Sequence, residues 1–283
     1  MKVSIGICAY NEEQNIGKLL ARLGNEPLLD EIIVVTSGCT DNTVSIATEF
    51  SRVKVWNDFE RRGKAVAVNQ FIEAAKGDVL ILESADTLPT NFCFKHLLAP
   101  FADNSVGMVG AHPIPVDSVR NNMGKVNHLL WKVHHQIALR NPKSGEVCAF
   151  RNIIKGIDPK TPVDEASIES QIIRLGYRVI YAPGAVVFNK GCGTIKDFIK
   201  QRKRIYYGHL ALKQSGYTVP SMSWGNLARA SLRAADYKHY RTLALTTVLE
   251  GWARLEARRE FRVNGYEPKA TVWEVSKTTK EVK

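Results

Sequence analysis

Four polar segments of this chain each follow an apolar, β-type run, and their residue types suit a phosphorylated ligand. Asn11 and Glu12 lie where a strand is expected to end and a helix to begin, and an amide can read the edge of a nucleobase. Small residues fill the segment 35–43, and cations flank a glycine in 61–64, which suits a phosphate. An acidic residue of the segment 83–89, Glu83 or Asp86, can hold a divalent cation, which in turn binds pyrophosphate oxygens. Taken singly, each segment is equally compatible with a helix cap, a simple turn or a solvent-exposed charge.

The elements that must position these segments alternate along the first half of the chain. Short apolar runs predict strands buried on both faces, at 3–7, 32–35, 53–56 and 79–82. Amphipathic runs between them predict helices, at 13–23, 43–50 and 64–75. This alternation predicts βαβ units and a doubly wound α/β domain, which binds its ligand at the carboxyl ends of the parallel strands. The four polar segments are therefore expected to meet at one edge of the sheet.

The second half of the chain alternates less regularly. Its predicted strands lie at 106–111, 146–150, 178–181 and 185–188. Its predicted helices lie at 121–139, 164–175, 194–215 and 229–261. Gly176 suits the left-handed end of the second of these helices, and the polar segment 271–283 is expected to fray.

Together the segments resemble the motifs of the family 2 glycosyltransferases, which have the GT-A fold. The resemblance is carried by Ala9-Tyr10-Asn11-Glu12-Glu13, Ser37-Gly38-Cys39-Thr40-Asp41-Asn42-Thr43, Gly63-Lys64-Ala65 with Asn69, and Lys76-Gly77-Asp78-Val79-Leu80-Ile81-Leu82 with Ala85-Asp86-Thr87-Leu88-Pro89. It implies an α/β fold of the nucleotide-diphospho-sugar transferase type, a doubly wound mixed sheet with a C-terminal helical extension. The implied domains are a catalytic domain, 1–190, with a nucleotide-binding half at about 1–105 and an acceptor half at about 106–190, and a basic helical extension, 191–283.

The resemblance places the donor nucleotide at the first strand ends, with a UDP- or GDP-sugar as the expected donor. The residues that it assigns to the nucleotide are Ala9, Tyr10, Asn11, Glu12, Thr36, Ser37, Lys64, Ser84 and Ala85. The family usually has one or two Asp at the positions of Thr36 and Ser37. These hydroxyls can still form hydrogen bonds, but they bring no charge to the base.

The resemblance also implies a metal site. The family motif is Asp-x-Asp, whose first position falls on Ser84 and whose last falls on Asp86. Asp86 is then the one direct metal carboxylate, and it would hold Mg²⁺ or Mn²⁺ together with the donor phosphates. Glu83 is displaced by one residue, which points it to the other face of a strand.

A pair of carboxylates, Asp164 and Glu165, is the implied catalytic base. Inverting members of the family carry a Glu-Asp pair about a dozen residues before a Leu-Gly-Tyr-Arg stretch, which is intact here at 175–178, and the order of the pair is swapped. Counting back from Gly176 favours Glu165, with Asp164 as the alternative. One carboxylate must take the acceptor hydroxyl proton as the oxygen attacks the anomeric carbon. Both carboxylates would also favour a helix N-terminus in the absence of any catalytic role.

Three further residues are implied near the diphosphate or the acceptor. Arg151 ends a segment that matches the family near the donor sugar. Gln201 and Arg204 match the Gln-x-x-Arg-Trp motif of membrane-associated members, with Ile205 in place of Trp. The same stretch is also a basic amphipathic helix without any such role. Three histidines are expected at the surface or in an acceptor groove, namely His128, His134 and His135.

Charge is distributed unevenly over the 283 residues. The net charge is +11, of which residues 1–190 carry +1 and residues 191–283 carry +10. A basic region of this kind predicts a polyanionic partner. An anionic membrane surface is favoured over nucleic acid, because no basic face is interleaved with aromatic residues. The apolar stripe within 245–255 is typical of an interfacial helix, or of one packed on the domain or on a second subunit of a homo-oligomer.

Composition excludes several classes of protein. A hydrophobic fraction of 45% and a charged fraction of 24% are those of a globular chain, which excludes disordered and collagen-like classes. Five scattered cysteines without a Cys-x-x-Cys pair argue against a disulfide framework and a zinc ribbon, and suggest reduced thiols. No leader and no run of about 18 apolar residues is present. A cytoplasmic protein is therefore expected, either free or peripheral at the cytoplasmic face of a membrane.

The expected activity is that of an inverting, metal-dependent glycosyltransferase acting on the hydroxyl of a lipid, lipid-linked or glycan acceptor. Two alternatives stay open. One is a non-catalytic nucleotide- or polyanion-binding protein of the same fold, which the departures at Thr36, Ser84 and Asp164 favour. The other is a sugar-nucleotide nucleotidyltransferase, which would need a Gly-rich phosphate loop after the first strand.

Overall fold

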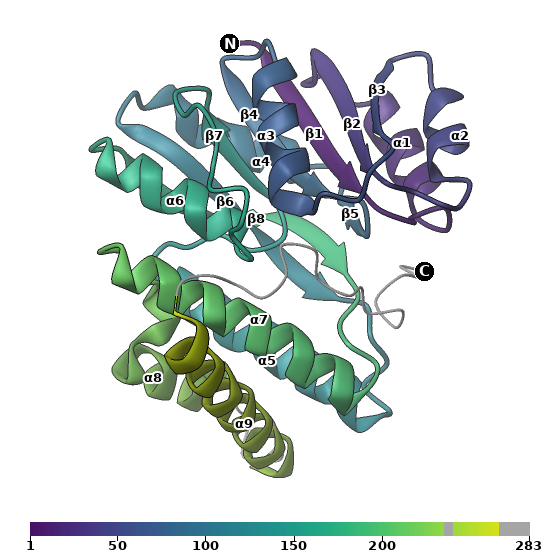
Figure 1. Cartoon of the computed structure of the whole chain (residues 1–283). Helices are drawn as coiled ribbons and strands as arrows, with labels where there is room; N and C mark the ends of the chain where they lie inside the picture. The colour runs from purple at the N-terminus through teal and green to yellow at the C-terminus, as the bar shows by residue number, and fades with distance from the viewer. Residues whose placement is uncertain (235–239, 266–283) are drawn as a thin grey trace.

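The computed structural model describes residues 1–234 and 240–265, and its centre is one mixed sheet of eight strands (Figure 1). The strand order is β3-β2-β1-β4-β7-β6-β8-β5. The bounds are β1 Val3–Ala9, β2 Glu31–Ser37, β3 Val53–Asp58, β4 Val79–Ser84, β5 Thr87–Pro89, β6 Val106–Pro115, β7 Cys148–Arg151 and β8 Arg178–Asn189. Strands β1 to β4 pair in parallel, and β7 runs antiparallel between β4 and β6. The predicted doubly wound mixed sheet is confirmed.

Helices cover both faces of the sheet. They are α1 Ile16–Gly24, α2 Thr43–Thr48, α3 Lys64–Ala74, α4 Cys93–Leu98, η1 Ala99–Ala102, α5 Asn122–Ala138, α6 Asp164–Arg174, α7 Ile195–Gln214, η2 Pro220–Met222, α8 Trp224–Ala234 and α9 Tyr240–Asn264. Helices α1, α2 and α4 share one apolar core with the sheet, and α3 and α6 share the core on its other face. Between Ile5 and Ile7, Gly6 faces α3, where an added Cβ would lie 2.2 Å from the Phe71 ring. A glycine at this position is what lets α3 pack so closely on β1.

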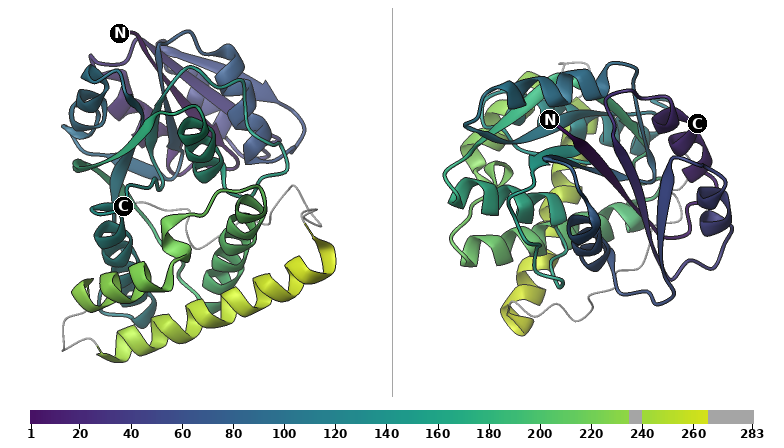
Figure 2. Two further views of the ribbon diagram at one scale, coloured as in Figure 1. Left: turned by 90° about the vertical axis from the view of Figure 1, so that its left-hand side faces the viewer. Right: turned by 90° about the horizontal axis from the view of Figure 1, so that it is seen from above.

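A helical part, formed by α5, α7, α8 and α9, lies below the sheet in Figure 1. It brings segments far apart in the sequence together, because α5 packs against α8 through Leu129, Val133 and Ala230. Leu249 of α9 packs with Phe198 of α7. Figure 2 shows α9 as a long helix along the outer side of this part. Among the helices described here, none is both long enough and apolar enough to cross a membrane.

Two predicted elements differ from those observed. The strands expected at 178–181 and 185–188 form the single strand β8, which pairs with β6 on both sides of a bulge where Gly110 pairs with Tyr181 and His112 with Val186. Pro183 lies within the bulge, where its missing N–H costs no hydrogen bond of the ladder, so β6 and β8 pair again beyond it. The helix expected at 229–261 begins earlier and is replaced by α8 and α9. The segment 271–283, expected to fray, lies outside the described residues.

Candidate active site

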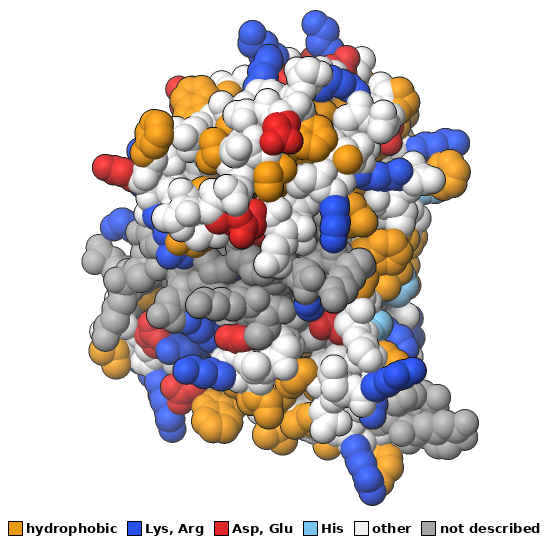
Figure 3. All heavy atoms as spheres, turned by 90° about the vertical axis from the view of Figure 1, so that its right-hand side faces the viewer, with side chains coloured by type: hydrophobic (Ala, Val, Ile, Leu, Met, Phe, Trp, Pro, Cys, Tyr) orange, Lys and Arg blue, Asp and Glu red, His pale blue; other side chains and the backbone are white. Residues whose placement is uncertain are grey.

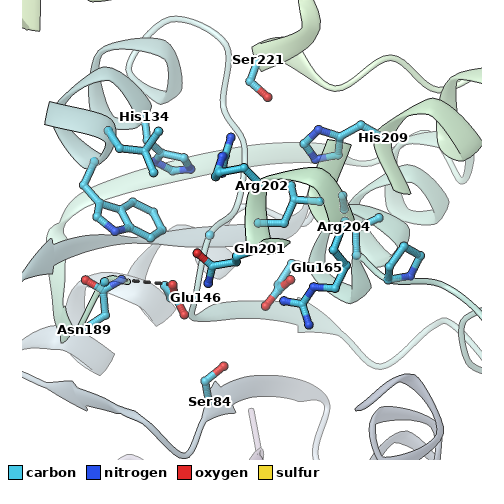
Figure 4. Close-up of a pocket in the computed structure, with 18 of the residues that line it drawn as sticks. Ser84, His134, Glu146, Glu165, Asn189, Gln201, Arg202, Arg204, His209 and Ser221 are labelled. Carbon is cyan, nitrogen blue, oxygen red and sulfur yellow. Dashed lines mark hydrogen bonds between the residues drawn. The ribbon is translucent and has the colours of Figure 1, made fainter. Parts of the chain in front are cut away.

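A cavity of about 580 Å³ lies beside the carboxyl ends of β1 and β4 and continues between the helices of the helical part (Figure 4). Its lining brings together most of the predicted residues, from the first strand to the seventh helix. Those that line it are Ala9, Tyr10, Glu12, Ser37, Lys64, Ser84, Ala85, Asp86, Asp164, Glu165, Gln201 and Arg204. Their individual roles remain predictions, but their convergence on one cavity is observed.

Two residues assigned to the nucleotide lie outside the cavity lining. The Asn11 side chain holds the neighbouring loop, where its Oδ1 accepts from the Thr40 backbone N–H at 2.8 Å. Thr36 is fully buried, and its hydroxyl donates to Asn57 Oδ1 at 2.8 Å. Successive side chains of a strand point to opposite faces, so the next residue, Ser37, reaches the cavity instead. Asn11 and Thr36 therefore do not line the cavity, whereas the other residues predicted to contact the nucleotide do.

Arg151 is also displaced from its predicted place. Strand β7 runs antiparallel to β4, so Arg151 pairs with Val79 at the start of β4, on the edge of the sheet opposite the cavity. Its guanidinium donates to the backbone carbonyls of Val106 at 2.8 Å and of Phe101 and Asp103 at 3.1 Å. Arg151 thus ties a loop to the sheet and does not reach the predicted diphosphate site.

The sheet end of the cavity offers an aromatic ring and short polar groups. The Arg61 guanidinium lies over the Tyr10 ring, 4.0 Å from its centroid. The Ser37 hydroxyl accepts from the Arg62 backbone N–H at 3.1 Å, and buried Glu12 accepts from Asn15 Nδ2 at 3.0 Å. A ring beside fixed hydrogen-bonding groups suits a base and its ribose.

Lys64 joins the two halves of the site. Its Nζ lies 2.7 Å from Asp164 Oδ2 and 3.2 Å from Glu165 Oε1. Burial would raise the pKa of Asp164, but the Lys64 charge, hydrogen bonds to Lys64 and to the backbone, and the Arg204 charge together lower that pKa. Burial raises the pKa of Glu165, and the Asp164 charge raises it further, which Lys64 offsets only in part. The pKa is thus lowered at Asp164 and raised at Glu165, which is the order expected if Glu165 accepts the proton and Asp164 pairs with Lys64.

Helix α7 holds the start of α6 in place. A Cβ on Gly208 would lie 2.7 Å from Val163, so glycine allows α7 to approach the residue that precedes α6. Arg204 lies one turn earlier on α7, and Figure 4 shows it beside Glu165, with Gln201 near both. Arg204 Nε is buried and has no hydrogen-bond partner within the described part of the chain. An unpaired guanidinium nitrogen in a cavity suits an oxyanion such as a diphosphate.

Two polar residues near Asp86 were not predicted from the sequence. Glu146 and Asn189 line the cavity with Asp86, and Asn189 Nδ2 donates to Glu146 Oε1 at 3.1 Å (Figure 4). Burial and the charges of Asp86 and Glu165 raise the pKa of Glu146 to about 7. Glu146 has a φ of 63°, a left-handed conformation that is unusual outside glycine and that clusters at functional sites. Only the chain fold reveals this pair, because no local spacing ties 146 or 189 to 86.

The oxygens around Asp86 fit a divalent cation. Asn189 Oδ1 is buried without a hydrogen-bond partner in the described residues, and a cation would both engage it and offset the repulsion between Asp86 and Glu146. Within 1–234 and 240–265 no group of three or more His, Cys, Asp or Glu could hold a metal alone. Phosphate oxygens would therefore complete the shell. Glu83 is fully buried, accepts from the Thr87 hydroxyl and does not line the cavity.

This sheet order, with a cavity at the carboxyl ends of the parallel strands, is the architecture of the GT-A glycosyltransferases. A family model described as glycosyl transferase family 2 matches residues 4–160. The chain belongs to this family, as the sequence motifs indicated.

Curated relatives match at low identity. The chain is 24% identical over 221 residues to a poly-beta-1,6-N-acetyl-D-glucosamine synthase of Staphylococcus aureus, which covers 70% of this chain and 52% of the synthase. It is 31% identical over 126 residues to a dolichol-phosphate mannosyltransferase of Pyrococcus furiosus, which covers 43% of this chain and 36% of that enzyme. The chain thus spans about half the length, or less, of the curated relatives it matches.

Two solved structures share the fold. A mannosyltransferase from Pyrobaculum calidifontis in complex with GDP-Man and Mn²⁺ has a TM-score of 0.63 at 21% identity, covering 96% of this chain and 77% of that one. Glucosyl-3-phosphoglycerate synthase from Mycobacterium tuberculosis, with Mn²⁺, UDP-glucose and phosphoglyceric acid, has a TM-score of 0.51 at 18% identity. The match covers 72% of this chain and 77% of the synthase. The first likeness extends over nearly the whole chain, helical part included.

Proposed function

We propose that the protein transfers a sugar, with inversion, from a UDP- or GDP-linked donor to an acceptor hydroxyl, and that it requires Mg²⁺ or Mn²⁺. The observation that carries the proposal is Glu165, whose pKa is raised and whose carboxylate is held by Lys64 in the cavity that Asp86 also lines. Family membership supports the class of reaction. The donors and the Mn²⁺ named for the two solved structures support the nucleotide and the metal.

The reaction would be a single displacement. The acceptor oxygen attacks the anomeric carbon while Glu165 takes its proton, and the bond from that carbon to the diphosphate breaks, with its electron pair passing to the diphosphate oxygen. Asp86, Glu146 and Asn189 would hold the divalent cation, which would neutralise the diphosphate charge when bound. Arg204 would donate to a diphosphate oxygen. Attack from the face opposite the leaving group inverts the anomeric centre.

Nucleotide binding tests this proposal without knowledge of the acceptor. The melting temperature would be measured with UDP, GDP, CDP and dTDP, each with and without Mn²⁺. We expect UDP or GDP to raise it, and to raise it further with Mn²⁺. No shift with any nucleotide would contradict the proposal and favour a non-catalytic polyanion-binding protein.

We further propose that the helical part meets an anionic lipid surface. The stripe predicted on α9 divides in the structure: Leu249 is buried, whereas Val248, Trp252 and Leu255 are exposed. Arg254 lies inside, with its guanidinium 5.0 Å from the Tyr206 ring. Figure 3 shows hydrophobic side chains next to Lys and Arg over the helical part. Exposed Trp and aliphatic side chains among cations suit the headgroup region of an anionic bilayer.

Vesicle flotation tests the lipid surface. We expect binding to phosphatidylglycerol vesicles, weaker binding to phosphatidylcholine vesicles, and loss in Trp252→Glu. Phe59→Glu is the matched control, because Phe59 is also exposed but lies far from α9 in the sequence, in the sheet part. A wild-type dimer that Trp252→Glu converts to a monomer, without any vesicle binding, would instead identify the stripe as an interface between copies.

A further inference from the structure

The cavity continues beyond the candidate catalytic residues. Figure 4 shows His134, Arg202, His209 and Ser221 on the far side of Glu165 from Ser84. Past them the cavity reaches a region between three helices, which we name the helical compartment. Its lining residues are Leu129, Val133 and Ile137 of α5, Leu227 and Ser231 of α8, and Leu243 and Thr247 of α9.

The walls of the helical compartment are largely apolar. Leu227 and Leu243 pack against buried Leu129, Val133 and Ile137 in one cluster, and the same side chains line the cavity. Empty apolar space is costly, by about 24 cal/mol per Å³ in core cavities, so packing alone does not favour keeping it. Apolar space continuous with a polar site is typical of a ligand pocket.

Charged groups between the two ends of the cavity form ion pairs with each other. Glu250 bonds to Arg202 and lies 3.4 Å from Arg254 Nε, so these three charges form one network. Burial lowers the pKa of His209 well below its usual value, and that of Lys143 to about 8. Two guanidinium groups share one carboxylate, so the network keeps a net charge of +1, while the side chains that line the helical compartment itself carry none.

Two buried side-chain atoms in this region, His134 Nδ1 and Ser144 Oγ, have no hydrogen-bond partner among the described residues. Burial holds the pKa of His134 well below its usual value, so the ring is neutral. Its Nε2 lies 3.4 Å from the Ser144 carbonyl oxygen, which can only accept, so Nε2 carries the proton and Nδ1 is an acceptor. Nδ1 is buried without a hydrogen-bond partner in the described chain. A ligand hydroxyl would supply the missing donor.

The helical compartment also reaches the surface. Trp224 and Thr247 line the cavity and are themselves exposed, and Val248 is exposed beside Thr247. An apolar chain longer than the helical compartment could therefore leave it on the side where the exposed stripe of α9 lies.

We infer that the acceptor is an amphiphile: a hydroxyl-bearing head between Glu165 and His134, and an alkyl-type chain in the helical compartment. The inference rests on the proposed transfer function, and it specifies the class of acceptor. The sheet end of the cavity takes the donor, and the helical compartment excludes water from the chain.

Calorimetry with hexyl, octyl and decyl β-D-glucosides, below their micelle concentrations, tests the inference. Each buried methylene should tighten binding about fourfold, hence about 15-fold from hexyl to octyl. Leu227→Trp, which fills the helical compartment from α8, should make hexyl and octyl glucoside bind equally. Leu232→Trp is the matched control on the same helix, because Leu232 is 77% exposed, and it should keep the 15-fold ratio.

Further variants separate the alternatives. If Leu227→Trp does not fold, Ser231→Phe fills the same space from the same helix. Equal affinities for hexyl and octyl glucoside in the wild type would overturn the inference. So would a chain-length dependence that Trp252→Ala removes and Leu227→Trp keeps, because the alkyl chain would then bind the outer face of α9.

Nucleotide titration of the same samples keeps the two proposals distinct. UDP or GDP binding with Mn²⁺ should be unchanged in Leu227→Trp. Nucleotide binding without any chain-length dependence would refute the amphiphilic acceptor alone. Chain-length dependence without nucleotide binding would refute the transfer function, and with it the designation of this ligand as an acceptor.

Discussion

The two ends of the cavity are built in different ways. At the sheet end, side chains come from segments that directly follow β1, β2 and β4, and the charged side chains range from 9% exposed at Asp164 to 40% exposed at Lys64. At the helical end, the walls come from α5, α8 and α9, and the Arg202, Glu250 and Arg254 side chains are at most 20% exposed. Charges pair with each other at both ends, but the sheet end leaves Lys64 partly exposed to a ligand, whereas the helical end encloses its charges and adds apolar walls.

This difference has a consequence for mutations. A change at the sheet end should alter nucleotide binding or rate with little effect on folding. A change in the charge network of the helical end should alter stability with little effect on nucleotide binding. Variants at each end therefore test whether nucleotide binding and stability depend on separate ends of the cavity.

The largest effect is expected from Glu165→Gln, which keeps the size of the side chain and removes the proposed proton acceptor. The transfer rate should fall by about 10²- to 10⁴-fold, the range for loss of a general base, while nucleotide affinity changes little. Because the pKa of Glu165 is raised, the wild-type rate should rise with pH through a value above the usual 4.5, and this limb should vanish in the variant.

Asp164→Asn is the control for this prediction. It should lower the rate less, because Asp164 is assigned to hold Lys64. Full activity in Glu165→Gln together with loss in Asp164→Asn would transfer the role of base to Asp164. Hydrolysis of the donor, which needs no acceptor, is the readout of the rate.

Glu250→Gln should give the next largest effect, on stability. It leaves Arg202 and Arg254 without their shared carboxylate, at a cost of about 2–3 kcal/mol in the free energy of unfolding, since partial exposure reduces the penalty of a fully buried pair. Burial raises the pKa of Glu250, but Arg202 and Arg254 together lower it, so the contribution of Glu250 to stability is present above pH 4.5 and is lost as pH falls through the folded-state pKa. Denaturant unfolding at pH 7 and at pH 3 measures both effects.

Unchanged UDP or GDP affinity in Glu250→Gln is the second half of that prediction. If nucleotide affinity fell together with stability, the two ends of the cavity would not be independent. Glu256→Gln, on the exposed side of α9 beside Arg259, is the matched control and should cost less than about 0.5 kcal/mol.

Asp86→Ala should weaken Mn²⁺-dependent nucleotide binding by about 10- to 100-fold, comparable with the loss of an orienting contact at a metal site. Binding measured without Mn²⁺ should change less, because the loops around Tyr10 and Ser37 remain. Asp103→Ala, a partly exposed carboxylate paired with Arg178, is the control. Equal losses with and without Mn²⁺ would argue against a metal at Asp86.

The smallest effects come from two neighbouring hydroxyls. Ser37→Ala should weaken nucleotide binding by about 0.5–1.5 kcal/mol, the range for one hydrogen bond. Thr36→Val should leave binding unchanged and cost about 1 kcal/mol in stability, because Asn57 Oδ1 loses its donor. Weaker nucleotide binding in Thr36→Val, with unchanged binding in Ser37→Ala, would show that Thr36 and not Ser37 contacts the nucleotide.

Some residues of the site were predictable from the sequence, and others were not. The convergence of Tyr10, Ser37, Lys64 and Asp86 was predictable, because parallel strands with right-handed crossovers bring successive loops to one edge. Thr36 and Ser37 could not be ranked, because the exact end of a strand decides which of two neighbours faces the ligand. Arg151 was predicted at the wrong edge of the sheet, because the residues of β7 do not indicate that this strand runs antiparallel to β4.

The residues that sequence inspection missed share one property: their partners are remote. Glu146 meets Asn189 43 positions later, and Arg202 meets Glu250 48 positions later. Neither pair has a local period or a spacing that would relate its members.

The amino-acid sequence by itself determined the alternation of strands and helices, the loops at the strand ends and the basic last third, because each depends on short-range periodicity or on counting. Tertiary packing alone decided which carboxylate is paired with Lys64, which oxygens surround Asp86, and that α5, α8 and α9 enclose an apolar space. These depend on distances between segments up to about a hundred residues apart, which only the packed sheet and helices fix.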